Sequence, residues 1–183
     1  MKFEALPLFG TYKIDLEKIT DDRGFFARLF CKREFEENNL NTQWVQINNS
    51  YNLQSGTVRG LHFQHPPDSE IKLVRCISGA IWDVIVDLRR DSPTFLQWFG
   101  LELTATNKSM LYIPEGFAHG FQTLTDQTEV LYFHNKVFKK NKEDGINVLD
   151  NQLKIYWPLP IANISERDKA FSYINNSFKG IIV

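Results

Sequence analysis

Between residues 72 and 135, turn signals divide the sequence into short apolar segments. The segments span residues 72–77, 80–89, 95–104, 110–113 and 128–135. The turns between them are Ser78-Gly79, Asp91-Ser92-Pro93-Thr94, Asn107-Lys108-Ser109 and Pro114-Glu115-Gly116. Short strands separated by turns at regular intervals are typical of a sandwich or barrel. The sequence therefore predicts an all-β fold.

The segment over residues 80–89 indicates how such strands are oriented. Its apolar side consists of Trp82, Val84, Val86 and Leu88. The other side carries Asp83, Asp87 and Arg89, with Ile81 and Ile85 among them. Because successive side chains of a strand point to opposite faces, this pattern predicts one dry face and one partly polar face. In a small barrel, we expect the polar members to point into the lumen or toward a partner sheet.

Only one stretch before residue 140 has a helical pattern. Residues 32–40 are mostly polar, with Phe35 as the main apolar residue to bury, which predicts a short surface helix. The sequence contains no repeat, low-complexity tract or linker, so we expect one domain over residues 1–183.

Composition excludes several classes of protein. The 183 residues include 21 Lys+Arg and 22 Asp+Glu, and this balance disfavours a nucleic-acid surface or a membrane anchor as a partner. No apolar run approaches the ~20 residues of a spanning helix, and Glu4 and Pro7 interrupt the stretch where a signal peptide would be apolar. Cys31 and Cys76 are far apart, which favours thiols buried in a cytoplasmic protein.

Two of the four histidines lie in distinctive motifs. His119 follows Pro114 and Gly116 in the PxGxxH spacing of the second cupin motif. The segment around His62 is similar to the first cupin motif, but Gln64 stands where a metal-binding cupin has its second histidine. Since glutamine is a poor ligand beside imidazole and carboxylate, we predict no metal and no cofactor. A metal-dependent cupin enzyme stays an alternative.

A series of collinear motifs extends this similarity over most of the chain. They are Asp-Asp-Arg-Gly-Phe-Phe (21–26), Arg-Gly-Leu-His-Phe-Gln (59–64), Lys-Leu-Val-Arg (72–75), Asp-Val-Ile-Val-Asp-Leu-Arg (83–89), Ser-Pro-Thr-Phe (92–95), Ile-Pro-Glu-Gly-Phe-Ala-His-Gly-Phe (113–121), Trp-Pro (157–158) and Ser-Glu-Arg-Asp (165–168). With them the sequence resembles the dTDP-4-dehydrorhamnose 3,5-epimerase family. The resemblance implies a cupin jelly roll with a few short peripheral helices and a homodimer that exchanges the N-terminal strands of about residues 1–30.

The family's reaction removes protons at C3 and C5 of a 4-keto-6-deoxy sugar nucleotide and returns them from the opposite face. A C–H beside a ketone is weakly acidic, so the reaction requires a base, a group that stabilises the enolate, and an acid. The resemblance implies that His62 is the base, that Asp168 orients its ring, that Tyr132 is the acid and that Lys72 lies near the enolate oxygen. In isolation, each of these residue types also has an ordinary structural role.

The resemblance also implies a set of substrate-binding residues. Arg59 would contact the diphosphate, Arg23 and Phe26 would reach the nucleotide across the dimer, and Gln46, Asn48 and His119 would line the pocket. Arg28 replaces a glutamate that helps to hold thymine in the family, and Phe138 replaces a tyrosine near the nucleotide. These differences leave open whether the carrier is dTDP, CDP or GDP.

We therefore expect an isomerase that epimerises C3, C5 or both in a dTDP-4-keto-6-deoxyhexose, within deoxysugar or L-rhamnose biosynthesis. Other possibilities are a sugar-nucleotide ketoisomerase and a carbohydrate-binding jelly roll without catalytic activity.

Overall fold

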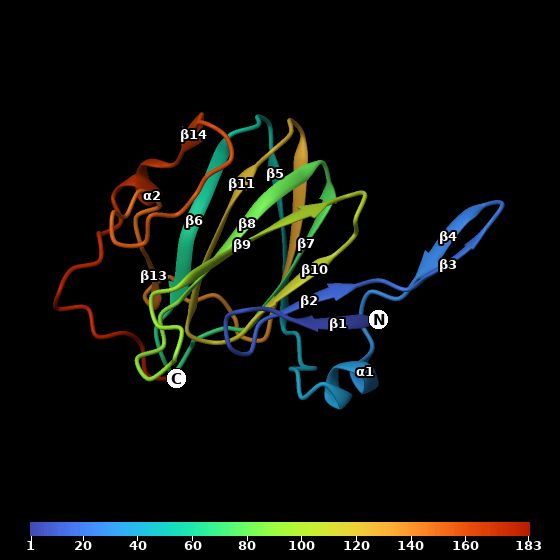
Figure 1. Cartoon of the computed structure of the whole chain (residues 1–183), viewed down its shortest axis with the longest axis horizontal. Helices are drawn as coiled ribbons and strands as arrows, with labels where there is room; N and C mark the ends of the chain where they lie inside the picture. Colours follow the sequence, from blue (N-terminus) through green and yellow to red (C-terminus); the bar gives the residue numbers. More distant parts are fainter.

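The computed structural model describes residues 1–183 and is built almost entirely of β-strands (Figure 1). One six-stranded sheet has the order β1 (Lys2–Ala5), β2 (Tyr12–Asp15), β10 (Met110–Ile113), β7 (Lys72–Ser78), β12 (Thr128–His134) and β5 (Gln46–Asn52). The second sheet has the order β13 (Glu143–Gly145), β6 (Thr57–Gln64), β11 (Phe117–Thr123), β8 (Ala80–Asp87) and β9 (Trp98–Thr104), with β14 (Asn163–Ile164) parallel to β6. The predicted all-β jelly roll is confirmed.

The interior between the two sheets is apolar toward β9 and β10. Val74 and Val130 from the first sheet pack in one cluster with Ile81, Ile85 and Phe121 from the second. The opposite face of β8 is also buried, because the chain after residue 145 covers it. Asp83 is fully buried between the sheets, so the partly polar face of the 80–89 segment faces the interior.

Strand boundaries differ from the prediction at residue 95. The strand predicted over residues 95–104 begins only at Trp98, because a turn occupies the preceding residues. The amide of Phe95 donates to the Ser92 oxygen, and Leu96 has a left-handed φ of 60° while its amide donates to the Asp87 oxygen. These bonds form a turn at the end of β8, so the regular ladder begins only at Trp98.

The predicted surface helix is present as α1 (Lys32–Glu37). It covers the outer face of the six-stranded sheet, where the buried Phe35 ring meets Phe3, Phe30 and Trp44 edge-on. The second helix, α2 (Glu166–Lys169), follows β14. No helix of the chain has the length and apolar character needed to cross a bilayer.

Both cysteines are free. Cys76 is buried and Cys31 is partly exposed, so the expected burial holds only for Cys76.

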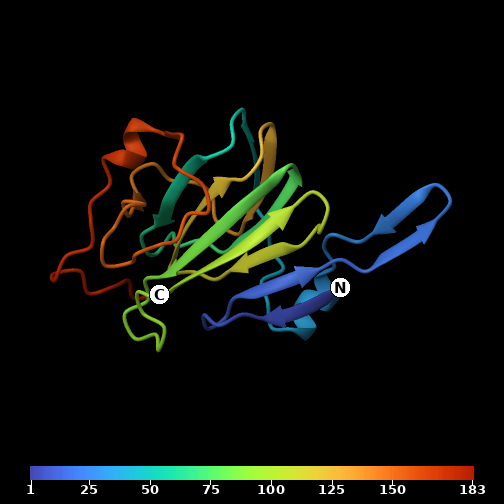
Figure 2. The ribbon, with the colours of Figure 1, turned by 45° about the horizontal axis from the view of Figure 1, so that its top comes forward.

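The hairpin formed by β3 (Lys18–Asp21) and β4 (Gly24–Ala27) extends away from both sheets (Figures 1 and 2). Its strands pair only with each other. The side chains of Ile19 and Phe26 are 72% and 68% exposed, which is unusual for large apolar residues in a strand pair.

Candidate active site

A cavity of about 290 Å³ lies between the two sheets, at the end where β5, β6, β7, β11 and β12 meet. Seven of the residues predicted for the site line it: Asn48, Arg59, His62, Lys72, His119, Tyr132 and Phe138. Asp168 lies behind His62, on a neighbouring cavity of the surface. The structure therefore brings together residues that are far apart in sequence.

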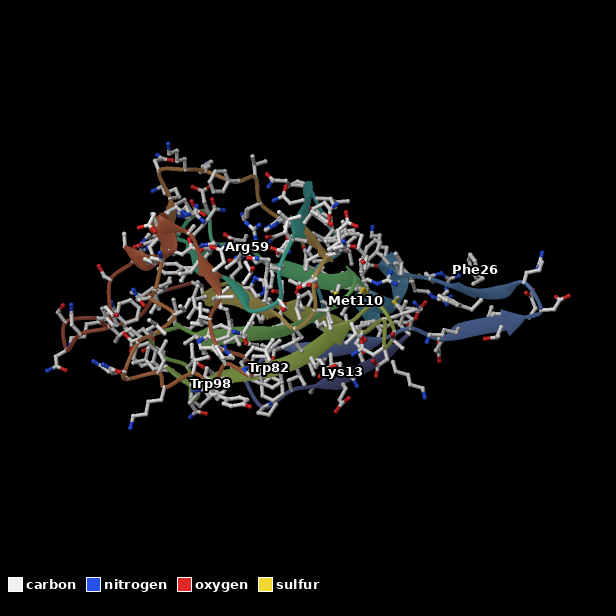
Figure 3. The ribbon with its side chains drawn as sticks, turned by 90° about the horizontal axis from the view of Figure 1, so that it is seen from above. Lys13, Phe26, Arg59, Trp82, Trp98 and Met110 are labelled. Carbon is white, nitrogen blue, oxygen red and sulfur yellow. The ribbon has the colours of Figure 1, made fainter.

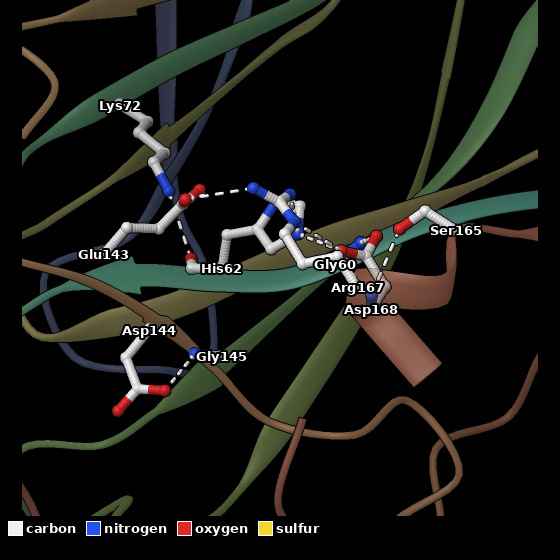
Figure 4. Close-up of polar contacts among 9 residues, drawn as sticks. All are labelled: Gly60, His62, Lys72, Glu143, Asp144, Gly145, Ser165, Arg167 and Asp168. Atoms are coloured by element: carbon white, nitrogen blue, oxygen red, sulfur yellow. Dashed lines mark hydrogen bonds and ion pairs between the residues drawn. The ribbon is translucent and has the colours of Figure 1, made fainter. Parts of the chain in front are cut away.

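The centre of the site is a hydrogen bond between His62 and Asp168 (Figure 4). The Nε2 atom of His62 lies 2.9 Å from Oδ1 of Asp168. The second carboxylate oxygen, Oδ2, accepts the amide hydrogen of Gly60 at 3.1 Å. Asp168 is buried, while His62 is partly exposed to the cavity. Two bonds thus fix the carboxylate, and the carboxylate in turn orients the imidazole.

Local structure after residue 162 brings Asp168 to this place. β14 runs parallel to β6, with Asn163 opposite Thr57. Ser165 then caps α2, because its Oγ accepts the amide hydrogen of Asp168 at 3.0 Å. Serine is a preferred residue at a helix N-cap, so the turn at Ser165 follows directly from the sequence.

A second contact supports the imidazole from the C-terminal segment. The ring of Phe171 meets the ring of His62 edge-on, with centroids 5.7 Å apart. Gly145 lies opposite His62 on β13, and a Cβ at Gly145 would approach the Phe171 ring to 2.4 Å. A side chain at position 145 would therefore displace the ring that packs against His62.

The charges around Asp168 keep it ionised. Burial raises the pKa of its carboxyl, but the hydrogen bond and charge of His62, the Gly60 amide and the charge of Arg167 together lower this pKa to about 2. An ionised carboxylate can only accept hydrogen bonds. The proton shared with His62 therefore resides on Nε2, which leaves the lone pair of the neutral ring on Nδ1.

Arg167 was not predicted as part of the site, although it directly precedes Asp168. Its Nε donates to Oδ1 of Asp168 at 3.2 Å, and its Nη1 donates to Glu143 at 2.9 Å (Figure 4). Its Nη2 also lies 2.9 Å from Nε2 of His62. Because a guanidinium only donates, this contact is not a hydrogen bond while Nε2 carries the proton that it gives to Asp168. The guanidinium of Arg167 and the imidazole of His62 therefore both contact Oδ1 of Asp168. The guanidinium also places a positive charge beside the imidazole.

Lys72 lies on β7, in the sheet opposite the one that carries His62. Its Nζ donates to the backbone oxygen of His62 at 3.1 Å and forms an ion pair with Glu70 at 2.8 Å. The lysine is buried and lines the cavity, so its ammonium is held at the site by these two contacts. Such a charge stabilises an anion more strongly than it would at the surface.

Tyr132 projects from β12 toward the same cavity. Its hydroxyl lies 2.9 Å from Oγ of Ser50 on β5. Burial raises the pKa of this phenol, and the bond to Ser50 offsets only part of that effect. Tyr132 is therefore protonated throughout the physiological range. Ser50 is a residue that sequence reasoning missed.

His119 forms a second histidine–aspartate pair. Its Nε2 lies 2.9 Å and 3.1 Å from the two carboxylate oxygens of Asp83, and both residues are buried. Burial raises the pKa of Asp83, while the charge and hydrogen bond of His119 counteract the increase. The His119 ring lies edge-on to Tyr132 at 6.1 Å, so this pair supports the cavity wall beside the phenol.

Two glycines allow β6 and β11 to approach closely near these pairs. A Cβ at Gly60 would lie 2.6 Å from Cα of Gly120, and Gly60 has a φ of +131° that L side chains rarely adopt. The ladder between the strands shifts register between His119 and Phe121. Such irregularities redirect side chains and are frequent beside functional sites.

Three of the predicted substrate-binding residues, Asn48, Arg59 and Phe138, are exposed and line the cavity. Arg59 is exposed and held by Asn52, whose Oδ1 accepts from its Nε at 2.6 Å. Gln46 does not line the cavity, but its amide donates to Asn48 at 3.2 Å and its Oε1 accepts the amide hydrogen of Phe138 at 3.0 Å. Gln46 thus connects Asn48 and Phe138, which both line the cavity.

Arg23 and Phe26 are remote from this cavity. Both lie on the β3–β4 hairpin, and Figure 3 shows Phe26 on this projection, away from Arg59 in the body of the molecule. Arg23 is exposed and pairs with Asp21. Arg28, noted as a departure from the family pattern, pairs with Glu34 at 3.1 Å.

Three ionisable residues of the cavity were not predicted: Glu70, His134 and Glu143. His134 follows Tyr132 by two residues on β12, so the alternation of a strand would have placed it on the same face. Glu70 precedes β7, where no alternation applies. Nowhere does the chain gather three or more His, Cys, Asp or Glu side chains in an arrangement that could hold a metal ion.

The fold and the site together define a class: a cupin-type jelly roll whose cavity presents a carboxylate-oriented imidazole, a protonated phenol and an ammonium. These are the groups that proton transfer at a carbon next to a carbonyl requires.

Comparisons with known proteins identify the family within this class. The model of the dTDP-4-dehydrorhamnose 3,5-epimerase family matches residues 5–176. A dTDP-4-dehydrorhamnose 3,5-epimerase from Shigella flexneri is 44% identical over 149 residues, which cover 81% of this chain and 82% of that protein. The chain therefore belongs to the dTDP-4-dehydrorhamnose 3,5-epimerase family and is an epimerase, which is an isomerase.

Solved structures agree with this assignment. The dTDP-4-dehydrorhamnose 3,5-epimerase from Bacillus anthracis with TDP and PPi bound has a TM-score of 0.92 and 39% identity, covering 94% of this chain and 99% of that one. A 3'-monoepimerase from Streptomyces bikiniensis in complex with dTDP-quinovose has a TM-score of 0.85 and 28% identity, covering 92% of this chain and 85% of that one.

Proposed function

We propose that the protein inverts C3, C5 or both in a dTDP-linked 4-keto-6-deoxyhexose, as a step of deoxysugar or L-rhamnose biosynthesis. The observation that carries this proposal is the 2.9 Å contact between Nε2 of His62 and Oδ1 of Asp168 at the edge of a cavity that Tyr132 and Lys72 also line. The names of the family and of its relatives supply the nucleotide and the sugar.

In the proposed mechanism His62 removes the proton on the carbon beside the C4 ketone. Because Asp168 holds the Nε2 proton, the Nδ1 lone pair is the base. As the proton transfers, the ring becomes an imidazolium, and the ionised carboxylate 2.9 Å away stabilises that charge. Asp168 is therefore proposed to position and stabilise the base rather than to take the proton.

Lys72 and Tyr132 are proposed to complete the exchange. The negative charge that develops on the C4 oxygen is stabilised by the buried ammonium of Lys72. The phenol of Tyr132, which burial keeps protonated, then returns a proton to the face opposite His62. Inversion needs two groups on two faces, and this requirement separates an epimerase from a ketoisomerase that moves a proton on one face.

The exposed residues of the cavity are proposed to hold the nucleotide. Arg59 is a suitable donor to a diphosphate because its guanidinium can form two parallel hydrogen bonds. Asn48, Gln46 and Phe138 form a connected group beside it, and His119 contacts the sugar from the cavity wall. dTDP is the proposed carrier, since the family and its relatives are named for dTDP sugars.

A homodimer that exchanges the N-terminal strands is also proposed. The β3–β4 hairpin exposes Ile19 and Phe26, and the outer face of the six-stranded sheet exposes Ile47 and Tyr51. On the same face, the Nε atom of Arg75 is buried without a hydrogen-bond partner. A second copy would cover these groups and bring Arg23 and Phe26 to the partner's cavity.

We further propose one domain over residues 1–183 and a cytoplasmic location, which suits the two free cysteines.

Proton NMR in deuterated water tests the function directly. Wild-type protein should incorporate deuterium at C3, C5 or both of a dTDP-4-keto-6-deoxyhexose, and CDP- and GDP-linked sugars in the same panel define the carrier. His62→Ala should abolish incorporation, whereas His65→Ala should not, because His65 pairs with Asp144 outside the cavity. Wild-type protein that exchanges no proton in any of these sugars would exclude the proposal.

A further inference from the structure

His134 lies beside Lys72 on the inner face of the six-stranded sheet. The two residues are directly opposite each other in the ladder between β12 and β7, and both line the cavity. Directly opposite residues of an antiparallel pair point to the same face, with Cβ atoms about 5 Å apart. The ring of His134 also stacks on Tyr132, with centroids 6.4 Å apart. His134 is therefore next to two of the groups that the proposed function assigns to the sugar.

A series of hydrogen bonds that begins at the backbone determines which nitrogen of His134 carries the proton. Oε1 of Gln46 accepts the amide hydrogen of Phe138 at 3.0 Å, so Nε2 of Gln46 is the atom that donates to Oδ1 of Asn48, at 3.2 Å. The atom of Asn48 that faces Nε2 of His134, at 3.5 Å, is then Nδ2. Because the nitrogen of an amide only donates, Nε2 of His134 accepts, and a neutral ring has its proton on Nδ1.

The surroundings of His134 keep its ring neutral at pH 7. Burial and the charge of Lys72 lower the pKa of His134 to about 4, and the charge of His119 acts in the same sense. The carboxylate of Glu70 raises this pKa, but its effect is smaller. A neutral imidazole can still donate one hydrogen bond, and it does so without placing a second full charge beside the Lys72 ammonium.

The Nδ1 atom of His134 has no hydrogen-bond partner in the protein, yet it is not buried. The only polar contact of the ring is the one at Nε2. The buried side-chain atoms that lack a partner belong to Trp44, Glu70 and Arg75, so Nδ1 is not among them. Since the side chain lines the cavity, a ligand there can reach this N–H group.

Lys72 also retains a hydrogen for a ligand. Its ammonium has three hydrogens, of which one is donated to the backbone oxygen of His62 at 3.1 Å and another to Glu70 at 2.8 Å. The third hydrogen of Lys72 and the Nδ1–H group of His134 are thus neighbouring donors without an acceptor in the protein. Two such donors are suited to an oxygen that gains negative charge during a reaction.

His134 and His62 have their protons on opposite nitrogens. The carboxylate of Asp168 faces Nε2 of His62 at 2.9 Å and keeps the proton there, which leaves a lone pair on Nδ1. The amide of Asn48 faces Nε2 of His134 and leaves the proton on Nδ1. One ring therefore has a lone pair at Nδ1 and the other has an N–H group, which suits a base and a hydrogen-bond donor respectively.

We propose that His134 is a catalytic residue whose Nδ1–H group donates a hydrogen bond to the C4 oxygen of the sugar, beside the ammonium of Lys72. This inference rests on the proposed function. The proton stays on Nδ1 throughout. The bond is stronger to the enolate oxygen than to the ketone, so it lowers the barrier to proton removal by His62. A neutral imidazole with a lowered pKa is suited to polarising a carbonyl in this way.

Two amide substitutions test the role of Nδ1 with matched chemistry. Asparagine has its amide nitrogen at the δ position, as in Nδ1 of histidine, whereas glutamine has it at the ε position, as in Nε2. We expect the rate of deuterium incorporation into a dTDP-4-keto-6-deoxyhexose to fall about 100-fold in His134→Gln and to stay within about tenfold of the wild type in His134→Asn. The rates are measured by proton NMR at saturating substrate under single-turnover conditions.

Binding measurements separate an effect on the reaction from an effect on the fold. Because dTDP has no C4 oxygen, both variants should bind it with the affinity of the wild type in a calorimetric titration. His65→Gln is the control, since His65 pairs with Asp144 outside the cavity, and it should retain the exchange rate and the affinity. Equal losses of rate in His134→Asn and His134→Gln, or wild-type rates in both, would overturn the inference and leave the proposed function intact.

The position of the proton can also be measured in the wild type, without any variant. In protein labelled with nitrogen-15 histidine, the imidazole spectrum at pH 7 should show a proton on Nδ1 of His134 and none on its Nε2, whereas Nε2 of His62 should be protonated. A proton on Nε2 of His134 would overturn the inference, and this result decides the matter if the variants do not fold. Wild-type protein that exchanges no proton in any keto sugar removes the proposed function and the inference together.

Discussion

Oδ1 of Asp168 lies 2.9 Å from Nε2 of His62, although 106 residues separate the two in the sequence. The parallel pairing of β14 with β6 and the cap at Ser165 bring the carboxylate to the imidazole. Because the carboxylate is ionised and also accepts the Gly60 amide hydrogen, it determines which ring nitrogen is protonated. The contact therefore decides whether the ring can act as a base at Nδ1.

Asp168→Asn should strongly reduce catalysis. The amide nitrogen of asparagine can donate to Nε2, which would move the ring proton to Nδ1 and remove the lone pair there. We expect the rate of deuterium incorporation to fall about 10³-fold or more, with little change in the affinity for substrate. The rate is measured by proton NMR in deuterated water under single-turnover conditions.

The chain contains a matched control for this substitution. His65 and Asp144 form another pair with the same 2.9 Å distance, but both side chains are about half exposed and Asp144 lies outside the cavity. Asp144→Asn should leave the exchange rate within about twofold of the wild type. Equal losses in both variants would show that Asp168 acts through the fold alone and not through the ring.

The lowered pKa of Asp168 predicts a pH-dependent stability. The carboxyl has a pKa of about 2 in the folded protein and about 4 when unfolded, so the unfolded chain binds its proton first as the pH falls. The stabilisation is present above about pH 5 and is lost toward about pH 2, with a magnitude of about 2 kcal/mol. Chemical denaturation at several pH values measures the free energy of unfolding.

In that experiment, the difference in unfolding free energy between wild type and Asp168→Asn should be largest at pH 5 to 7 and should shrink as the pH approaches about 2. Asp91→Asn is the control, because Asp91 is exposed and forms no ion pair. A difference that is constant over the whole range would contradict the depressed pKa of Asp168.

Much of the fold could be predicted from local patterns. The alternation in residues 80–89 correctly separated an apolar face from the face that carries Asp83, because strand periodicity depends only on neighbouring residues. Each family motif is also a short contiguous segment, so it can be recognised from neighbouring residues alone. The beginning of β9 was predicted three residues too early, since the turn before Trp98 depends on bonds to Asp87 in another strand.

The rest of the site depends on register, which a single sequence does not reveal. His134 enters the cavity because β12 pairs with β7 so that His134 lies opposite Lys72. A shift of one residue would turn its side chain to the outer face. Ser50 reaches Tyr132 through the pairing of β5 and β12 in the same way. Such contacts were visible only in the structure.

Tyr132→Phe should separate proton removal from inversion. Removal needs only the base and the enolate stabiliser, whereas inversion also needs a donor on the other face. We expect deuterium incorporation to stay within about tenfold of the wild type while net inversion falls about 100-fold or more. Ser50→Ala, which removes the partner of the hydroxyl, should reduce inversion far less. Proton NMR follows both processes in one sample, and a parallel loss of both would exclude Tyr132 as the donor.

The remote position of Arg23 and Phe26 leads to a prediction about mixed dimers. If the β3–β4 hairpin completes the partner's cavity, Phe26→Glu should prevent this docking and abolish activity while leaving the cavity of its own chain intact. His62→Ala should be inactive for a different reason, because it lacks the base but retains the hairpin. A mixed dimer of the two variants then contains one complete site, formed by His62 of one chain and Phe26 of the other.

Unfolding and refolding the two variants together should therefore restore activity. Random pairing makes half of the dimers mixed, and each mixed dimer has one complete site of two, so the mixture should recover roughly a quarter of the wild-type exchange rate. Each variant refolded alone should stay inactive, and a mixture of His62→Ala with Asp168→Asn should recover nothing, because both changes lie on the same cavity.

If the Phe26→Glu and His62→Ala mixture also recovered nothing while both variants formed dimers, the hairpin would not contribute to the partner's site. If Phe26→Glu alone were as active as wild type, the phenylalanine would have no role in either copy.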